Sequence, residues 1–345
     1  MRFAQLVGSR SLEVVVGADP APRPGQAVVA IDYCGIGGSD RSAWVTGEVA
    51  SPAWFGHEWT GRIVQLAQDM PDRFVGQRVV AAVGPSCGQC RPCAFGTPAH
   101  CERVLEQIVG LDPLAASHGG FATHTVADAR RLMPVGEAID SRDAVLTEPA
   151  AVAAHAVRRS GFSLGDVVVV LGTGTIGLLT AELARIGGAA AVVSVDHASA
   201  RRELACDLGA DAAFAGVNKG LTTWLHDHTN GLGADVVFVC VDAAEAIAGG
   251  LGLVRPGGVI VAVGVGNQIE NLSVTALLRR EADFRVSLGY TIDDVRRVQT
   301  LMGVDQLRVR RLLQPANVAL DQLADALQNE NQSSGPPKAV VGVSA

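Results

Sequence analysis

Four cysteines stand close enough together in the sequence to hold one metal ion. They follow the pattern Cys-x2-Cys-x2-Cys-x7-Cys, and they are Cys87, Cys90, Cys93 and Cys101. Four thiolates fill every position of a tetrahedral Zn²⁺, so a site of this kind orders a lobe of the protein rather than performing chemistry. The spacing therefore predicts a structural zinc site, and we expect the neighbouring His100 to stay outside it.

A glycine-rich segment has the spacing of a dinucleotide-binding turn. It consists of Gly172, Thr173, Gly174, Thr175, Ile176 and Gly177. An apolar run precedes it and a helical pattern follows, which is the context that this motif requires. The first glycine permits a tight turn, the second lets the backbone approach a pyrophosphate, and the third lets the helix pack on the strand.

A carboxylate follows this turn at the separation expected for ribose recognition. Asp196 stands nineteen positions after Gly177, at the predicted end of the next strand. It can accept hydrogen bonds from the adenosine ribose and would repel a 2′-phosphate, so NAD is favoured over NADP. Arg201 and Arg202 could neutralise such a phosphate, or they lie in a solvated first turn of the following helix. The segment predicts a nicotinamide cofactor, with Arg201 as a further candidate contact.

The elements that would position these groups change in character near residue 155. Before it the chain reads as short strands and turns, with β-rich runs at residues 12–16, 27–33, 61–66 and 78–83. A helical segment follows at 144–159. Strands are then predicted at 167–171, 191–195, 235–241 and 259–263, with helices at 176–186 and 199–208. This alternation predicts an α/β protein with a doubly wound parallel sheet beside an all-β domain. After a helix at 292–302, the last strand, 338–343, is expected to return to the first block.

Composition and charge exclude several classes of protein. The chain has 345 residues, 48% of them hydrophobic, which is enough for two separate cores. Its net charge of −7, with no basic block, argues against nucleic acid as a partner. The longest nearly uncharged run with a strand-like start, 167–181, is shorter than the ~20 residues that a membrane span needs, and the first residues lack the pattern of a signal peptide. We therefore expect a cytoplasmic protein without a membrane partner. Cys206 and Cys240, on a predicted helix and a predicted strand, are expected to pack in the core.

These motifs together indicate a family. The cysteine lobe, Gly56-His57-Glu58, Glu148-Pro149 and the glycine turn, in this order, resemble the zinc-dependent medium-chain alcohol and polyol dehydrogenases. The resemblance covers essentially the whole chain. It implies a GroES-like catalytic domain at 1–155 with a zinc lobe at about 84–104, a Rossmann NAD-binding domain at 156–290, and a C-terminal return at 291–345. It also implies hydride transfer between an alcohol and nicotinamide, in a homodimer or homotetramer.

The resemblance further implies a catalytic zinc, and here the sequence departs from the family. The family holds this zinc with a cysteine of a Gly-Ile-Cys-Gly-(Ser/Thr)-Asp segment and with residues matching His57 and Glu148, while Glu58 is an auxiliary ligand. The cysteine position is Gly37 in this chain. His57, Glu58 and Glu148 can still bind zinc with a water molecule, or they form a metal-free hydrogen-bonded cluster. Cys34 could supply a thiolate after a backbone rearrangement, or it is a buried residue at a strand end.

The proton path departs from the family as well. Ser39 matches the family's hydroxyl that passes on the alcohol proton, but the histidine that commonly follows it is absent. Proton release would then run through Ser39 and solvent. Trp44, Trp54 and Phe55 flank this region and either wall an apolar substrate pocket or belong to the core.

Three functions follow as hypotheses. The first is an NAD-dependent dehydrogenase acting on an alcohol/ketone pair, which the retained His57, Glu58 and Glu148 favour. The second is a reductase of the same fold that lacks the catalytic zinc and reduces an activated C=C or C=N bond, which Gly37 favours. The third is a nucleotide-binding protein without catalysis. For assembly, residues 259–265 are a candidate edge-strand interface.

Overall fold

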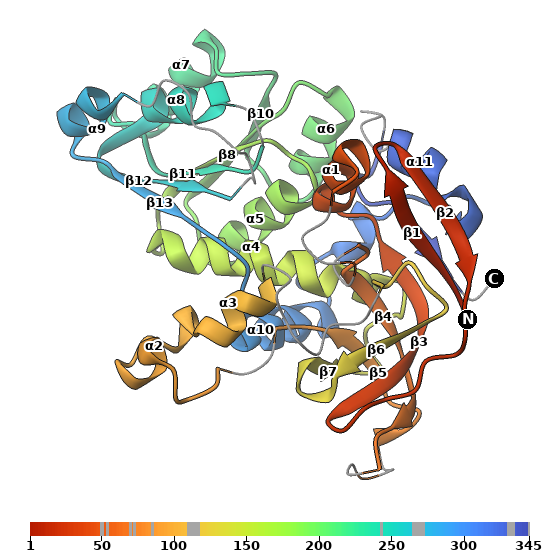
Figure 1. Ribbon diagram of the computed structural model, residues 1–345. Helices are drawn as coiled ribbons and strands as arrows, with labels where there is room; N and C mark the ends of the chain where they lie inside the picture. Colours follow the sequence, from red (N-terminus) through yellow and green to blue (C-terminus); the bar gives the residue numbers. More distant parts are fainter. Residues whose placement is uncertain are drawn as a thin grey trace.

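The computed structural model describes residues 1–48, 52, 55–68, 71, 74–83, 86–108, 118–241, 244–263, 273–329 and 335–343. Two large sheets organise the chain, one parallel and one mainly antiparallel (Figure 1). Within the described residues, no helix is both long enough and apolar enough to span a bilayer.

The parallel sheet has six strands in the order β10-β9-β8-β11-β12-β13, and all five neighbouring pairs are parallel. The strands are β8 (Val167–Leu171), β9 (Ala191–Val195), β10 (Ala212–Phe214), β11 (Ala234–Val239), β12 (Val254–Ala262) and β13 (Asp283–Val286). The helices that connect them are α5 (Thr175–Ile186), α6 (Ser199–Asp207), α7 (Lys219–His228), α8 (Ala244–Leu253) and α9 (Val274–Arg280). Every residue of β8 and β9 is buried, as a strand covered on both faces requires. This is the doubly wound sheet that the sequence predicts, and its order reverses between β8 and β11.

The second sheet gathers strands from both ends of the chain. Its order is β14-β15-β3-β4-β5-β7, and β6 pairs with β3. The strands are β3 (Gln26–Gly35), β4 (Glu58–Leu66), β5 (Arg78–Ala81), β6 (His124–Asp128), β7 (Leu132–Pro134), β14 (Val318–Ala319) and β15 (Val340–Gly342). The C-terminal β15 pairs antiparallel with β3, and β1 (Arg2–Gly8) and β2 (Ser11–Val16) form a separate hairpin. In Figure 1 the blue C-terminal segment accordingly lies beside the red N-terminal one.

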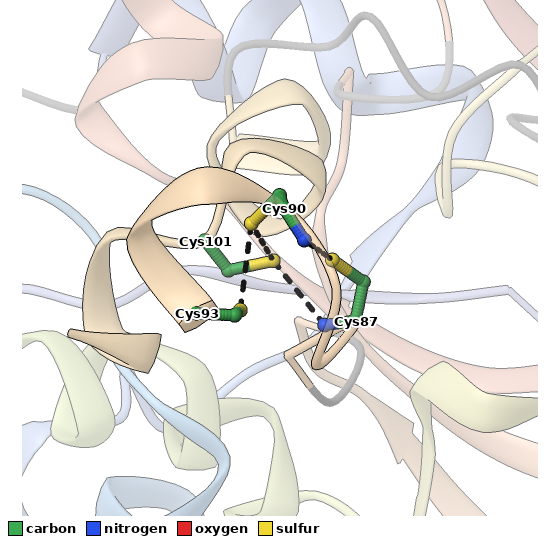
Figure 2. A group of neighbouring side chains, drawn as sticks. All are labelled: Cys87, Cys90, Cys93 and Cys101. Atoms are coloured by element: carbon green, nitrogen blue, oxygen red, sulfur yellow. Dashed lines mark hydrogen bonds between the residues drawn. The ribbon is translucent and has the colours of Figure 1, made fainter. Parts of the chain in front are cut away.

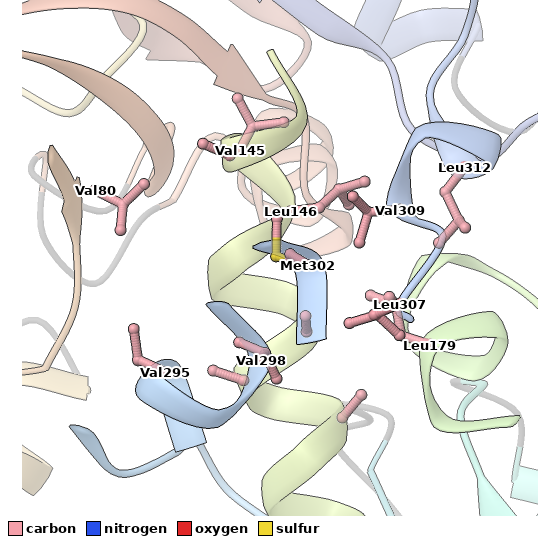
Figure 3. Packing of buried hydrophobic residues seen from close by; sticks show 14 of the residues in the cluster. Val80, Val145, Leu146, Leu179, Val295, Val298, Met302, Leu307, Val309 and Leu312 are labelled. Carbon is pink, nitrogen blue, oxygen red and sulfur yellow. The ribbon is translucent and has the colours of Figure 1, made fainter. Parts of the chain in front are cut away.

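One hydrophobic core joins the two sheets through helix α4 (Thr147–Ser160). A short 3-10 helix, Asp143–Leu146, leads into α4, so the helix predicted at 144–159 consists of a 3-10 segment followed by an α-helix. Figure 3 shows Val80 of β5, Leu179 of α5 and Val298 of α10 (Ile292–Gly303) packed around α4. The first turn of α4, which carries Glu148, therefore has a fixed position relative to both sheets.

A buried charge cluster also fastens α10 to α4. Asp294 is 1% exposed, and its carboxylate lies 3.1 Å from His155 Nδ1 and accepts two hydrogen bonds from Arg158, at 3.0 and 3.1 Å. Thr291 caps α10 and donates its hydroxyl to the same carboxylate at 2.7 Å. Burial raises the pKa of Asp294, but these hydrogen bonds outweigh it and hold the pKa well below its usual value.

Two expectations from the sequence are wrong. Cys206, expected in the core, is exposed on the last turn of α6, whereas Cys240 is half-buried just after β11. The candidate interface at 259–265 falls largely on β12, which is paired on both sides and so has no free edge; the outer strand at this end of the sheet is β13. Residues 264 and 265 lie outside the described residues. Four further helices were not predicted from the sequence: α1 (Gly38–Thr46), α2 (Arg91–Ala94), α3 (Glu102–Ile108) and α11 (Leu323–Asn329).

Candidate functional site

The four cysteines predicted to bind zinc converge in space. Figure 2 shows their side chains gathered at α2, where Cys90 precedes the helix and Cys93 lies within it. The four sulfur atoms all lie within 4.8 Å of one another, and Cys90 Sγ is 3.4 Å from Cys93 Sγ and 3.8 Å from Cys101 Sγ. A tetrahedral zinc with Zn–S bonds of ~2.3 Å needs sulfurs about 3.8 Å apart. The donor set therefore fits Zn²⁺ in both ligand type and spacing.

Backbone N–H groups prepare these sulfurs for a cation. Cys87 Sγ accepts from the N–H of Cys90, and Cys101 Sγ accepts from the N–H of Cys87, both at 3.3 Å. Hydrogen bonds from the backbone of Gln89 and Cys90 lower the pKa of Cys87 to about 6. Since the thiolate is the form that binds metal, these hydrogen bonds favour the ligand form of Cys87, whereas burial raises the pKa of Cys93 to about 12.

The three glycines of the dinucleotide-binding turn have the geometry that their proposed roles need. Gly172 has φ = +88°, in the left-handed region that favours glycine. A Cβ on Gly177 would lie 1.8 Å from the carbonyl oxygen of Gly172, so no larger residue fits between β8 and α5. A Cβ on Gly174 would meet nothing within 4 Å, so space is open above the start of α5. Gly174 also leaves the first N–H groups of α5, those of Thr175 and Ile176, without a side-chain cap.

Asp196 lies directly after β9, beside this turn. Its Oδ2 accepts hydrogen bonds from the backbone N–H and the hydroxyl of Thr173, both at 2.9 Å. Its Oδ1 accepts from the N–H of Ala198 at 2.9 Å. A carboxylate offers about four lone-pair sites, so the side chain is held in place and can still accept from a ligand hydroxyl. Arg201 is buried in the first turn of α6, two residues after Ser199.

The second predicted group also comes together. His57, Glu58 and Glu148, hereafter the carboxylate–histidine cluster, place one ligand atom each within 4.8 Å of the others. His57 follows a turn at Gly56, where φ is +82°, and Glu58 begins β4. Glu148 comes from the first turn of α4, ninety residues after Glu58.

Asp40 is a member of this site that the sequence analysis missed. It is 1% exposed, and its two oxygens accept from the N–H of Gly37 at 2.8 Å and of Gly56 at 2.7 Å. The same carboxylate lies 3.7 Å from His57 Nδ1. Asp40 therefore joins the start of α1 to the turn that carries His57 and orients the imidazole ring. Its place directly after Ser39, in the motif quoted for the family, was the available signal.

Lys338 is the second residue that the sequence analysis missed. Its Nζ donates to both oxygens of Glu58, at 2.8 and 2.6 Å, and to the carbonyl oxygen of Ile36 at 2.7 Å. The lysine side chain is 3% exposed and the glutamate side chain 5% exposed. Strand pairing produces this contact, because Glu58 lies opposite Gly35 and Val340 lies opposite the same glycine from the other side. The only available signal was composition: the chain has two lysines, Lys219 and Lys338.

The charges of the site act strongly on its titratable groups. Burial by itself would lower the pKa of His57, but the negative charges of Asp40, Glu148 and Glu58 raise it to about 10. Burial raises the pKa of Glu148 to about 7, against the opposing effect of His57. The carboxylate–histidine cluster therefore retains protons near neutral pH and can hold or move one.

Gly37 lies where the family's zinc-binding cysteine would enter this cluster. A Cβ on Gly37 would lie 3.1 Å from Glu58 Oε1 and 3.3 Å from His57 Cε1. No side chain is present there, and both oxygens of Glu58 already bind an ammonium group. Catalytic zinc sites use three protein ligands, and this chain has no side chain at position 37 and an ammonium group on Glu58, so this donor set does not fit a catalytic zinc.

The rearranged Cys34 ligand is not supported by the structure. Cys34 lies on β3 and is fully buried in the hydrophobic core, where its Sγ contacts the carbonyl oxygen of Gly35. Among the described residues, the metal-binding groups do not include it. Burial raises the pKa of its thiol well above the usual value, which disfavours the thiolate.

The remaining candidates divide between surface and core. Ser39 is exposed in the first turn of α1, directly before Asp40. Trp44 and Phe55 are each 3% exposed and belong to the same hydrophobic core as Cys34, where Phe55 contacts Phe121 edge to face. Trp54 lies outside the described residues. The two described aromatic residues are therefore part of the core.

Comparison with known proteins identifies relatives of both parts of the chain. Residues 23–137 match the family described as Alcohol dehydrogenase GroES-like domain, and residues 175–303 match Zinc-binding dehydrogenase. Among characterised sequences, 2-dehydro-3-deoxy-L-galactonate 5-dehydrogenase of Pseudoalteromonas atlantica is 28% identical over 100% of this chain and 99% of its own. Sorbitol dehydrogenase of Halalkalibacterium halodurans is 33% identical over 73% of each chain.

A solved structure extends the comparison to the whole fold. A Sinorhizobium meliloti 1021 protein assigned to the zinc-binding dehydrogenases, determined with bound NADP, superposes with a TM-score of 0.85 at 27% identity and covers 99% of both chains. The chain thus belongs to the zinc-type medium-chain dehydrogenases, oxidoreductases of GroES-like and Rossmann architecture that transfer a hydride between an alcohol or ketone and a nicotinamide cofactor.

Proposed function

We propose that this enzyme interconverts a secondary alcohol and a ketone on a polyol or a sugar acid, with NAD as cofactor. The observation that carries the proposal is that Asp40 orients His57. Asp40 directly follows the exposed Ser39, and the same chain has a dinucleotide turn at the end of β8. The substrate class follows from the relatives, one named for sorbitol and one for a deoxygalactonate. These names give no support to a reductase of C=C or C=N bonds.

The cofactor would bind along the carboxyl ends of β8 and β9. The pyrophosphate would lie over Gly174, where space is open, and receive the N–H groups of Thr175 and Ile176. Asp196 would accept the ribose hydroxyls and repel a 2′-phosphate, so NAD is preferred. Arg201, in the first turn of α6, is a further candidate contact to this end of the cofactor.

The chain's own residues would manage the proton while the carbon–hydrogen bond breaks. When bound, the nicotinamide accepts the hydride from the carbinol carbon or returns it to the ketone. In the oxidative direction the hydroxyl proton passes to Ser39 and then to solvent, since Ser39 is exposed. His57, oriented by Asp40, would donate a hydrogen bond to the substrate oxygen and stabilise its developing negative charge. Glu148 would lie beside the His57 imidazole, within 4.8 Å of it.

Several further assignments belong to the same proposal. The four cysteines hold a structural zinc, and the domain limits are 1–155, 156–290 and 291–345. We place the enzyme in the cytoplasm, because an oxidising compartment would pair cysteines that serve here as thiolate ligands. A homodimer or homotetramer would use the edge of β13 that pairs with no strand among the described residues, on which Val286 is 59% exposed.

The test is a substrate panel read by NADH formation. Sorbitol, galactitol and aldonates are each offered with NAD and with NADP, beside simple alcohols and an activated enone with NADH. We expect turnover on at least one polyol or sugar acid, with a higher kcat/KM for NAD. An Asp40→Asn variant should reduce kcat more than it changes the Kd of NAD. Turnover confined to the enone, or NAD binding without any turnover, would contradict the proposal.

A further inference from the structure

The cation nearest to Glu58 is a residue of the chain itself. Lys338 Nζ lies 2.8 and 2.6 Å from the two carboxylate oxygens, and both side chains are at most 5% exposed. The ammonium group also donates to the carbonyl oxygen of Ile36, so its position is fixed by three hydrogen bonds. An ion bound to Glu58 with a Zn–O distance of about 2.1 Å would lie within about 5 Å of this charge and be repelled by it.

The position of the missing ligand is equally well defined. A Cβ on Gly37 would lie 3.1 Å from Glu58 Oε1, 3.2 Å from Asp40 Oδ2 and 3.3 Å from His57 Cε1, so a side chain at this position would border the cluster. Cys34, the nearest cysteine in sequence, is buried in the core instead. Besides Glu58, the cluster offers a metal one nitrogen and one carboxylate, from His57 and Glu148, which is fewer than the three protein ligands of a catalytic zinc.

We propose that the carboxylate–histidine cluster holds no zinc in the native enzyme, and that Lys338 is its resident cation. The chain then carries one zinc, at the four cysteines, and performs its hydride transfer without a metal at the reacting oxygen. The inference deepens the proposed function, because it takes His57 as part of the active site.

Zinc stoichiometry tests this directly. The full-length enzyme is equilibrated with excess zinc, freed of unbound ion, and analysed by elemental mass spectrometry. The variants are His57→Ala, Gly37→Cys, Gly37→Ala and Gly37→Cys combined with His57→Ala. Gly37→Ala is the matched control, since it adds the same Cβ without the sulfur and shows by its thermal unfolding whether that atom is tolerated.

We expect one zinc per chain in the wild type, unchanged in His57→Ala and in Gly37→Ala. The zinc content of Gly37→Cys should rise to two ions per chain, and it should return to one when His57 is also replaced by alanine. Two zinc ions in the wild type, one of them lost with His57→Ala, would overturn the proposal. A single zinc in a folded Gly37→Cys would also overturn it, because position 37 would then not be the missing ligand. If the glycine variants do not fold, the zinc content of the wild type and of His57→Ala still shows whether the cluster binds zinc.

The test separates this inference from the proposed function. An enzyme that binds two zinc ions and oxidises a polyol would refute the metal-free cluster and retain the dehydrogenase. If the chain holds one zinc, polyol oxidation should persist in the presence of a chelator that removes weakly held metal. Loss of turnover in that chelator, with the zinc of the four cysteines retained, would count against the inference.

Discussion

Replacing Lys338 by methionine should destabilise the enzyme more than almost any other single substitution at the site. The ammonium makes two hydrogen bonds to Glu58 and one to Ile36, all in the interior. Methionine retains the alkyl chain but removes the hydrogen-bonded ammonium group from the buried Glu58 carboxylate. Breaking a buried pair from one side costs about 3–5 kcal/mol, and the side-chain exposures of 3% and 5% place this pair in that range.

The assay is urea unfolding followed by fluorescence and circular dichroism. The wild type is compared with Lys338→Met, Glu58→Gln and the double variant. Because the double variant carries no unpaired charge, it should be more stable than Lys338→Met, with a coupling free energy of at least about 2 kcal/mol. Lys219→Met is the control, since Lys219 is exposed and its loss should change the stability by less than about 0.5 kcal/mol. Equal effects of the two lysine substitutions would refute the reasoning.

Three further predictions concern other parts of the chain. Gly177→Ala should weaken NAD binding at least tenfold by calorimetry, because the added Cβ would lie 1.8 Å from the oxygen of Gly172 and must displace the turn; an unchanged Kd would contradict the assigned geometry. Asp196→Asn keeps an acceptor for Thr173 but loses the charge, so the ratio of kcat/KM for NADP over NAD should rise about tenfold, or ~1.4 kcal/mol; a constant ratio would mean that Asp196 does not select the cofactor. Asp294→Asn should lower the free energy of unfolding by about 2–4 kcal/mol at pH 7. Because the native pKa of Asp294 is lowered, its stabilisation is present above the unfolded-state pKa of about 3.9 and is lost as the pH falls below it, so the difference between variant and wild type should shrink below pH ~4. A difference that stays constant down to pH 2 would exclude this linkage.

The sequence was sufficient wherever the chemistry is local along the chain. The four cysteines are separated by at most fourteen positions, so a single loop and a short helix bring them together and their spacing alone indicates the ion. The dinucleotide turn is similarly contiguous, and the strands predicted at 167–171 and 191–195 have the bounds observed for β8 and β9. Continuous apolar runs and glycine positions are properties of neighbouring residues, and they need no knowledge of distant contacts.

Tertiary structure alone decided the character of the second site. Lys338 and Glu58 are 280 positions apart, and they meet because β15 and β4 pair with opposite edges of β3. Asp40 reaches Gly56 and His57 through the placement of α1 against a turn, which no periodicity encodes. The motif residues His57, Glu58 and Glu148 could be named from sequence, but whether Glu58 is free to bind a metal depends on a buried partner. Pairing and burial determine that availability, and both arise only when the two ends of the chain close into one sheet.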